Sequence, residues 1–158
     1  MNVGSLPSKG SHLPAQTLQV LDEIITDFQD LPEADRLELL LEFSDNLPEP
    51  PERYAGHEDE MEQVTECQTP LFLALEYSED EDPIVTLIIS APPEAPTTRG
   101  FAGVLVEGLS GQRASAILAV PDDIPNKLGL TNALTPLRLR GMSALLGRIK
   151  RNITTHLS

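Results

Sequence analysis

The spacing of apolar residues changes twice along this chain of 158 residues. Up to about residue 47 they recur every three or four positions, as on one face of an α-helix. Between residues 61 and 90 they alternate or form short runs, as in β-strands, and after residue 98 the helical spacing returns. A chain with strands between two helical parts is predicted to have an α+β fold, in which a small sheet packs against helices.

Two helices are expected before the strands. The first should run from Pro14, which suits a first helical turn, to Leu31, and the second should begin at Pro32. The prolines of "LPEPPE" (47–52) cannot continue a helix, so they are expected to end the second one. Its predicted apolar stripe consists of Leu37, Leu40, Leu41 and Leu47.

Three strands are expected next: "MEQVTE" (61–66), "LFLALEY" (71–77) and "IVTLIIS" (84–90). Because short connections separate them, the predicted sheet is a three-stranded antiparallel meander. Cys67, the single cysteine of the chain, then lies in the loop between the first two strands.

The part after the strands is expected to be helical. A helix is predicted over residues 99–109, with Thr97 or Thr98 as its cap. A short helix in "RASAILAV" (113–120) and a helical turn in "DDIPNKLGL" (122–130) should follow. The first of these helices needs close packing against another backbone, because three glycines weaken it: Gly100, Gly103 and Gly108.

A longer helix is expected at the end of the chain. Thr135 can cap it, and Pro136 suits its first position. Arg148, Lys150 and Arg151 are expected in its final turns, where positive charge complements the helix dipole. Its predicted apolar stripe consists of Leu139, Met142, Leu145, Leu146, Ile149 and Ile153.

The charge of the chain is uneven. The formal net charge is −14, yet residues 22–82 carry 21 acids and two bases, whereas residues 83–158 carry four acids and eight bases. An acidic surface repels phosphate groups, so neither nucleic acid nor an anionic membrane is expected as a partner. A protein partner with a basic face is compatible with this charge, although the charge could serve solubility alone.

Composition bounds the class of protein. Residues 1–13, rich in Gly, Ser and Pro, are predicted to be a flexible tail, and residues 14–158 are predicted to be a single domain. No apolar run is long enough to span a membrane, no signal-peptide pattern is present, and one cysteine cannot form an internal disulfide. We therefore expect a cytoplasmic protein.

The residue types leave few kinds of chemistry open. One cysteine and three histidines are too few for a structural zinc site or an iron–sulfur cluster, and the chain has no Gly-rich phosphate loop or serine nucleophile elbow. We interpret "HEDE" (57–60) as a hydrated surface loop rather than a cation site. A Cys–His hydrolase would need His57 beside Cys67. Neither a metal nor a cofactor is expected.

Cys67 remains as the candidate reactive group. A lone cysteine is more often a small buried apolar residue than a nucleophile. Here its neighbours Glu66, Gln68 and Thr69 are polar, and Pro70 closes the loop directly before the second strand. The carboxylate of Glu66 disfavours a thiolate beside it, and burial would do the same. The thiol is therefore expected to react slowly until a partner docks.

Three segments, taken in order, carry a resemblance to a known family. The first is "CQTPLFLAL" (67–75), the second "TRGFAGVLVEGLSGQRASAILAVP" (98–121), and the third "LGLTNALTPLRLRGMSALLGRIK" (128–150). They resemble the Cys-Gln-Ser-x-Val-Trp-Leu segment, the helix opening on a basic residue and Gly, and the Leu-Ser/Thr-Pro-x-Arg-x-x-Gly end of the SufE family. The agreement in order and spacing covers residues 15–155.

The resemblance implies a fold and an activity. SufE proteins have a small antiparallel sheet packed with helices, related to the IscU scaffold, and accept sulfur from cysteine desulfurases in iron–sulfur cluster biogenesis. By resemblance, this chain would be a sulfur carrier and desulfurase activator rather than an independent enzyme. Its partners would be a cysteine desulfurase, which is a pyridoxal-phosphate enzyme, and a downstream sulfur acceptor or cluster scaffold.

The resemblance also implies site residues. Cys67 matches the cysteine that accepts the persulfide, and Arg138 matches the arginine of the Pro-x-Arg motif, expected on the partner-facing surface. Glu66, Gln68 and Thr69 are the further candidates for partner binding. Glu66 stands where the family usually has Gly, so the cysteine loop is expected to follow its own path.

Two other hypotheses stay open. The protein could be a non-catalytic acidic interaction module in which Cys67 is only structural. A redox sensor is a weaker alternative, because the chain has no second cysteine to resolve an oxidised Cys67.

Overall fold

The computed structural model describes residues 18–67 and 69–158. The predicted tail (1–13), the start of the first helix at Pro14 and the candidate residue Gln68 lie outside the described residues. In the part of the chain that is described, no helix is both long and apolar enough to cross a membrane.

The elements follow the predicted order of helices, strands and helices. In chain order they are α2 (Gln19–Gln29), α3 (Glu33–Asn46), η1 (Glu52–Tyr54), η2 (Glu58–Glu60), β1 (Glu62–Gln63), η3 (Thr65–Cys67), β2 (Phe72–Tyr77), β3 (Ile84–Ser90), α4 (Pro96–Leu109), β4 (Gln112–Arg113), α5 (Ala114–Leu118), α6 (Ile124–Lys127) and α7 (Pro136–Leu157). The η elements are single turns of 3₁₀ helix.

The sheet is antiparallel, with the strand order β1-β2-β3-β4. This confirms the α+β prediction, but the sheet has four strands where three were predicted. The fourth, β4, pairs Arg113 with Ile84 and Gln112 with Val85. A strand of two residues is too short to show an alternating pattern, so periodicity could not reveal it.

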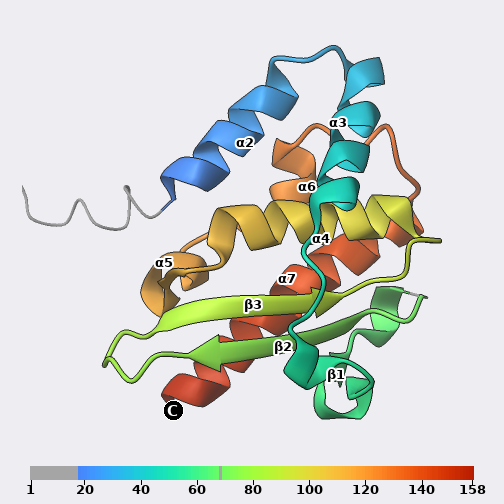
Figure 1. Ribbon diagram of the computed structural model, residues 1–158. Helices are drawn as coiled ribbons and strands as arrows, with labels where there is room; N and C mark the ends of the chain where they lie inside the picture. The colour runs from blue at the N-terminus through green and yellow to red at the C-terminus, as the bar shows by residue number, and fades with distance from the viewer. Residues whose placement is uncertain (1–17, 68) are drawn as a thin grey trace, which may run out of the picture.

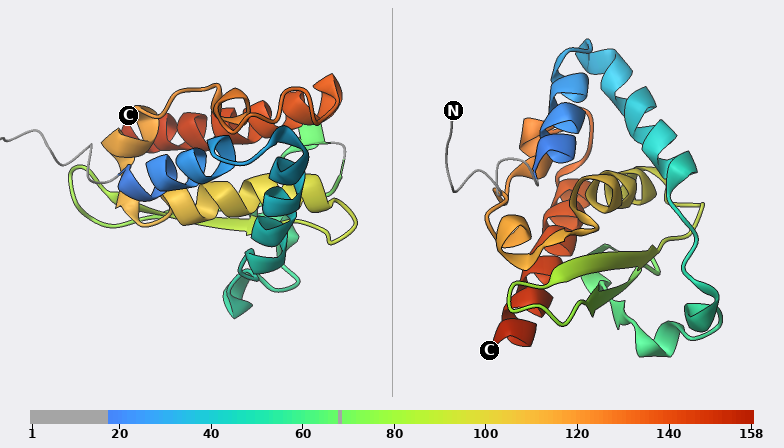
Figure 2. Two further views of the ribbon diagram at one scale, coloured as in Figure 1. Left: turned by 90° about the horizontal axis from the view of Figure 1, so that it is seen from above. Right: turned by 60° about the vertical axis from the view of Figure 1, so that its left-hand side comes forward.

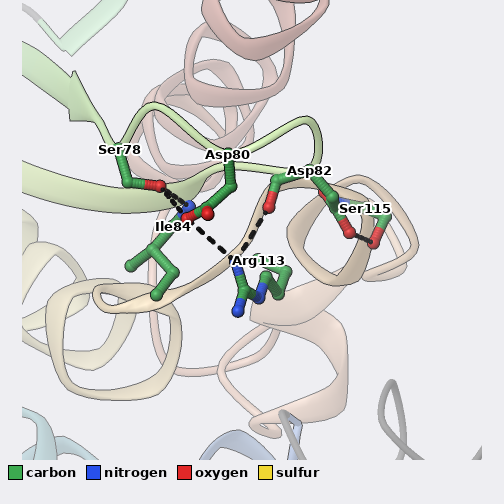
Figure 3. A network of polar contacts seen from close by, with 6 residues as sticks. All are labelled: Ser78, Asp80, Asp82, Ile84, Arg113 and Ser115. Carbon is green, nitrogen blue, oxygen red and sulfur yellow. Dashed lines mark hydrogen bonds and ion pairs between the residues drawn. The ribbon is translucent and has the colours of Figure 1, made fainter.

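Polar contacts hold β4 at the edge of the sheet (Figure 3). Arg113 donates hydrogen bonds to the carboxylate of Asp80 (3.3 Å) and to the backbone oxygen of Asp82 (3.1 Å). The carboxylate of Asp82 also accepts from the backbone N–H of Ser115, in the first turn of α5 (3.0 Å). The acidic turn after β2, which we predicted only as a connection, therefore also anchors the segment that follows α4.

The helices form two layers on one side of the sheet. Figures 1 and 2 show α4 and α7 next to the sheet, with α2 and α3 on the far side of α4. Helix α4 lies at the centre of the core and contacts α2, α3, α7 and β3. Its fully buried apolar residues are Phe101, Ala102, Val104, Leu105 and Leu109.

The glycines of α4 make this central position possible. A Cβ at Gly100 would collide with the backbone oxygen of Leu40, and a Cβ at Gly103 with that of Phe43. The expected close approach to another backbone is therefore present, and the partner is α3. Leu40 on α3 is fully buried by this contact, whereas Leu41 is 37% exposed, so the prediction that Leu41 belongs to the stripe was wrong.

Two helices are longer than predicted. Helix α4 begins at Pro96 with Ala95 as its N-terminal cap, so Thr97 lies inside the helix and does not cap it. Helix α7 begins at Pro136 as predicted and continues to Leu157, which places Arg148 in its middle rather than in a final turn. Its predicted apolar stripe is buried except for Leu139, which is only partly covered.

Replacing Gly103 by Ala should destabilise the fold, because α3 and α4 must separate to admit the methyl group. We expect a loss of about 1–3 kcal/mol of unfolding free energy, as for other overpacked core sites. The matched control is Gly147→Ala on α7, where an added Cβ meets no atom within 4 Å. Removing this helical glycine should stabilise by about 0.5–1 kcal/mol. Urea unfolding measures both, and equal effects of the two variants would contradict this account.

Candidate functional site

Cys67 ends a single 3₁₀ turn, η3, that joins β1 to the segment before β2. The backbone N–H of Val64 donates to the oxygen of Leu71 (2.9 Å), and that of Cys67 donates to the oxygen of Val64 (3.2 Å). The hydroxyl of Thr69 donates to the oxygen of Cys67 (3.4 Å). Val64 itself is fully buried. The cysteine therefore sits in a compact, hydrogen-bonded turn.

The side chain of Cys67 is covered by helix α7. It is only 9% exposed, and its Sγ lies 3.5 Å from the backbone oxygen of Gly141, to which the thiol donates. A Cβ at Gly141 would lie 3.3 Å from the Cα of Cys67 and 3.5 Å from its Sγ. Cys67 lies between the first two strands, as expected, but its polar sequence neighbours gave no sign that α7 covers the sulfur. The absent side chain of Gly141 lets the turn rest on the helix backbone, and this contact covers the sulfur.

A pocket of about 420 Å³ opens beside the cysteine, and we call it the Cys67 pocket. Thr69 and Arg138, two of the predicted site residues, line it together with Cys67. The guanidinium of Arg138 donates to the hydroxyl of Thr97 in the same pocket (3.3 Å). The backbone N–H of Arg138 donates to the hydroxyl of Thr135, which caps α7 as predicted. The start of α7 thus places a positive charge in the pocket that the thiol lines.

Glu66 is not among the residues that line the Cys67 pocket. Its carboxylate accepts a hydrogen bond from Nε of Arg148 on α7 (2.9 Å). It borders a second, shallow hollow on the surface of α7, lined mainly by apolar atoms of residues that include Leu137 and Leu139. The predicted site residues are therefore divided between two neighbouring pockets, with Thr69 and Arg138 in one and Glu66 in the other, and Gln68 lies outside the described residues.

The surroundings keep the thiol protonated. Burial raises the pKa of Cys67 to about 11, the negative charge of Glu66 adds to the rise, and the positive charge of Arg148 opposes it. The hydrogen bond from Arg148 in turn holds the pKa of Glu66 below its usual value. Because the pKa of Cys67 lies well above neutral pH, very little thiolate exists in the free protein. This agrees in direction with the slow thiol expected from the sequence, although burial contributes more than Glu66.

Three residues of the site were missed by the sequence analysis: Gly141, Thr97 and Arg148. A glycine inside a strongly amphipathic helix is a sign of close packing, so the position of Gly141 could have been noticed. Thr97 was considered only as a cap, and it is buried (8% exposed). Arg148 carried no such signal, because its partners lie more than 80 positions away in the sequence.

His57 does not complete a Cys–His pair in this structure. Its Nδ1 lies 3.1 Å from a carboxylate oxygen of Glu60, and it is not among the residues that line the Cys67 pocket. Possible ligand atoms of His57, Asp59 and Glu60 lie within 4.8 Å of one another, but all three residues are exposed. Such exposed acidic groups are common without a bound ion, so we keep the interpretation of a hydrated loop.

Alkylation of Cys67 by iodoacetamide should show the raised pKa directly. The rate should climb with pH towards a midpoint of about 11, since only the thiolate reacts. Glu66→Gln removes one cause of the shift and should lower that midpoint. A midpoint near 8.5, the ordinary value for cysteine, would contradict the covered position of the sulfur.

Comparison with known proteins supports one family. The family described as "SufE: Fe-S metabolism associated domain" matches residues 22–153. An uncharacterised SufE-like protein of Mycobacterium tuberculosis is 51% identical over 140 residues, which cover 89% of this chain and 95% of that one. The cysteine desulfuration protein SufE of Plasmodium falciparum is 27% identical over 94 residues, covering 60% of this chain and 38% of that one.

A solved structure has the same fold. The solution structure of a hypothetical protein from Thermus thermophilus matches with a TM-score of 0.73 and 39% identity, over 87% of this chain and 95% of that one. The family match covers the helices, the sheet and the cysteine turn together. This chain therefore belongs to the SufE family, the domain associated with Fe-S metabolism.

Proposed function

We propose that this protein accepts sulfur from a cysteine desulfurase onto Cys67 and carries it as a persulfide for iron–sulfur cluster biogenesis or a related sulfur transfer. One observation carries the proposal: the single thiol of the chain ends a short turn and lines a pocket together with Arg138. Membership of a family associated with Fe-S metabolism is consistent with it. Accepting the sulfur would clear the desulfurase and so stimulate it.

The transfer needs no external oxidant or reductant. The thiolate of Cys67 attacks the outer sulfur of a persulfide on the desulfurase, as in thiol–disulfide exchange. A sulfur–sulfur bond forms on Cys67 while the one on the desulfurase breaks. The desulfurase cysteine leaves as a thiolate and can take up the proton that Cys67 gives up. The outer sulfur keeps its oxidation state throughout.

Docking must change the state of the thiol in this proposal. In the free protein the sulfur is nearly covered and protonated, so it is protected from other reactants. A partner that draws the turn away from Gly141 would expose the sulfur and reduce the burial that raises its pKa. The guanidinium of Arg138, which lines the same pocket, would then favour a negatively charged sulfur.

The rival function is a non-catalytic interaction module. Its best support is that Cys67 belongs to the continuous cluster of buried apolar residues, as a structural cysteine would. In that case the acidic part of the chain would bind a basic partner, and the thiol would take no part. The two functions predict different effects of replacing the thiol of Cys67 by a hydroxyl: the first loses sulfur transfer, and the second loses nothing.

Incubation with a cysteine desulfurase and free cysteine should add one sulfur atom to Cys67, detected by mass spectrometry of the intact protein and its peptides. Cys67→Ser keeps the size of the side chain, so it should abolish the added sulfur and the stimulation of the desulfurase while binding persists. A control, Cys67→Ser combined with Ser143→Cys, returns a thiol to an exposed position on α7. Stimulation of the desulfurase that survives Cys67→Ser would favour the rival, whereas sulfur transfer restored by the relocated thiol would contradict a specific role for the cysteine turn and its pocket.

A further inference from the structure

Arg148 contacts three residues of the segment that leads to the cysteine. Its guanidinium donates to the carboxylate of Glu62 (2.6 Å), to that of Glu66 (2.9 Å) and to the hydroxyl of Thr65 (3.4 Å). The arginine side chain is only 18% exposed. We call these four residues the Arg148 clamp. It ties the start of β1 and the turn η3 to the middle of helix α7.

The clamp differs from the other ion pairs of the described residues. Arg148 is the one cation among residues 18–67 and 69–158 that pairs with two carboxylates. Each of the other pairs joins one cation to one carboxylate, and most of their acids are largely exposed. An arginine with both carboxylates in place is geometrically specific, because its planar fork fixes where each acid lies.

Apolar packing and the clamp together hold the turn in place, because Val64 and Cys67 belong to the buried core cluster. The thiol makes one long hydrogen bond to Gly141, and the backbone of the turn bonds mainly within its own segment. Apart from that bond of the thiol, the side-chain hydrogen bonds between the turn and α7 in the described residues come from the clamp. Because the acids of the clamp are partly exposed, at 36% and 43%, a partner can reach them.

We propose that Arg148 is a positioning residue for Cys67: it clamps residues 62–66 to α7 and keeps the thiol against Gly141 until basic side chains of the desulfurase compete for Glu62 and Glu66. The release of the turn by the desulfurase rests on the proposed function. The claim that Arg148 holds the turn against α7 concerns the free protein alone. The partner chemistry follows from the two carboxylates, which offer negative charge to any cation that displaces Arg148.

Two effects of Arg148 on the thiol have opposite signs, and this makes the clamp testable. Its positive charge lowers the pKa of Cys67, so charge alone predicts that removing it leaves less thiolate and slows alkylation. Its contacts hold the sulfur under cover, so the clamp predicts that removing it exposes the sulfur and speeds alkylation. The direction of the change decides between a simple charge effect and a positioning role.

The test is alkylation of the full chain by iodoacetamide at one fixed pH. Arg148→Gln should speed modification of Cys67 roughly fivefold, equivalent to about 1 kcal/mol for the loss of two partly exposed ion pairs. Arg148→Lys should restore part of the slow rate. The matched control is Lys150→Gln on the same helix, which breaks a pair with Asp122 at a similar exposure (17%) and should leave the rate unchanged.

A second variant guards against loss of the fold. Glu62→Gln breaks one arm of the clamp without changing the charge next to Cys67, and should speed alkylation by a smaller factor. Circular dichroism and urea unfolding verify that each variant is folded. Salt of about 1 M, which screens charges beyond roughly 3 Å, should speed the reaction of the wild type more than that of Arg148→Gln.

An unchanged or slower rate in folded Arg148→Gln and Glu62→Gln would overturn the clamp. This result is separable from failure of the proposed function, since alkylation needs no desulfurase. If the wild type gains no sulfur from the desulfurase, the sulfur-transfer proposal fails, whatever the alkylation rates show. If the wild type gains sulfur but the variants alkylate at its rate, only the clamp fails.

Discussion

The contact between the cysteine turn and Gly141 is the feature on which the site depends. Because residue 141 has no side chain, the turn rests directly on the backbone of α7, and the thiol of Cys67 donates a hydrogen bond to the carbonyl oxygen of Gly141. Arg138 and Arg148 lie three residues before and seven residues after Gly141, spacings that bring them to the same side of a helix. Helix α7 thus covers the sulfur at Gly141, contributes Arg138 to the Cys67 pocket and holds the cysteine turn through Arg148.

The acidic and basic parts of the chain form ion pairs with each other at this site. Glu62 and Glu66 come from the acidic part of the sequence, and Arg148 comes from the basic part. Their pairing joins the two parts next to the candidate residue Cys67. The thiol is buried beside a carboxylate, which keeps it protonated, while the nearby arginine limits that effect. A sulfur carrier gains from such an arrangement, because an uncovered sulfur would react before it met its partner.

Much of the fold could be predicted because long amphipathic segments dictate which faces are buried. The stripe of α7 consists of six residues at helical spacing, and Thr135 followed by Pro136 marks the start of that helix. Leu41 was misassigned because it neighbours Leu40, and a pattern cannot tell which of two adjacent leucines faces α4. Strand β4 was missed because two residues have no period.

The site was less predictable because it depends on contacts distant in the sequence. The identity of Cys67 as the candidate and of Arg138 as its neighbour came from residue types and from the family resemblance. The burial of the sulfur came from the packing of η3 on α7, which no local pattern encodes. A structure of the complex with a cysteine desulfurase tests the account most directly. We predict that Sγ of Cys67 leaves the oxygen of Gly141, 3.5 Å away in the free protein, and faces the active site of the desulfurase while α7 stays in place. A complex competent in sulfur transfer in which that contact persists would contradict it.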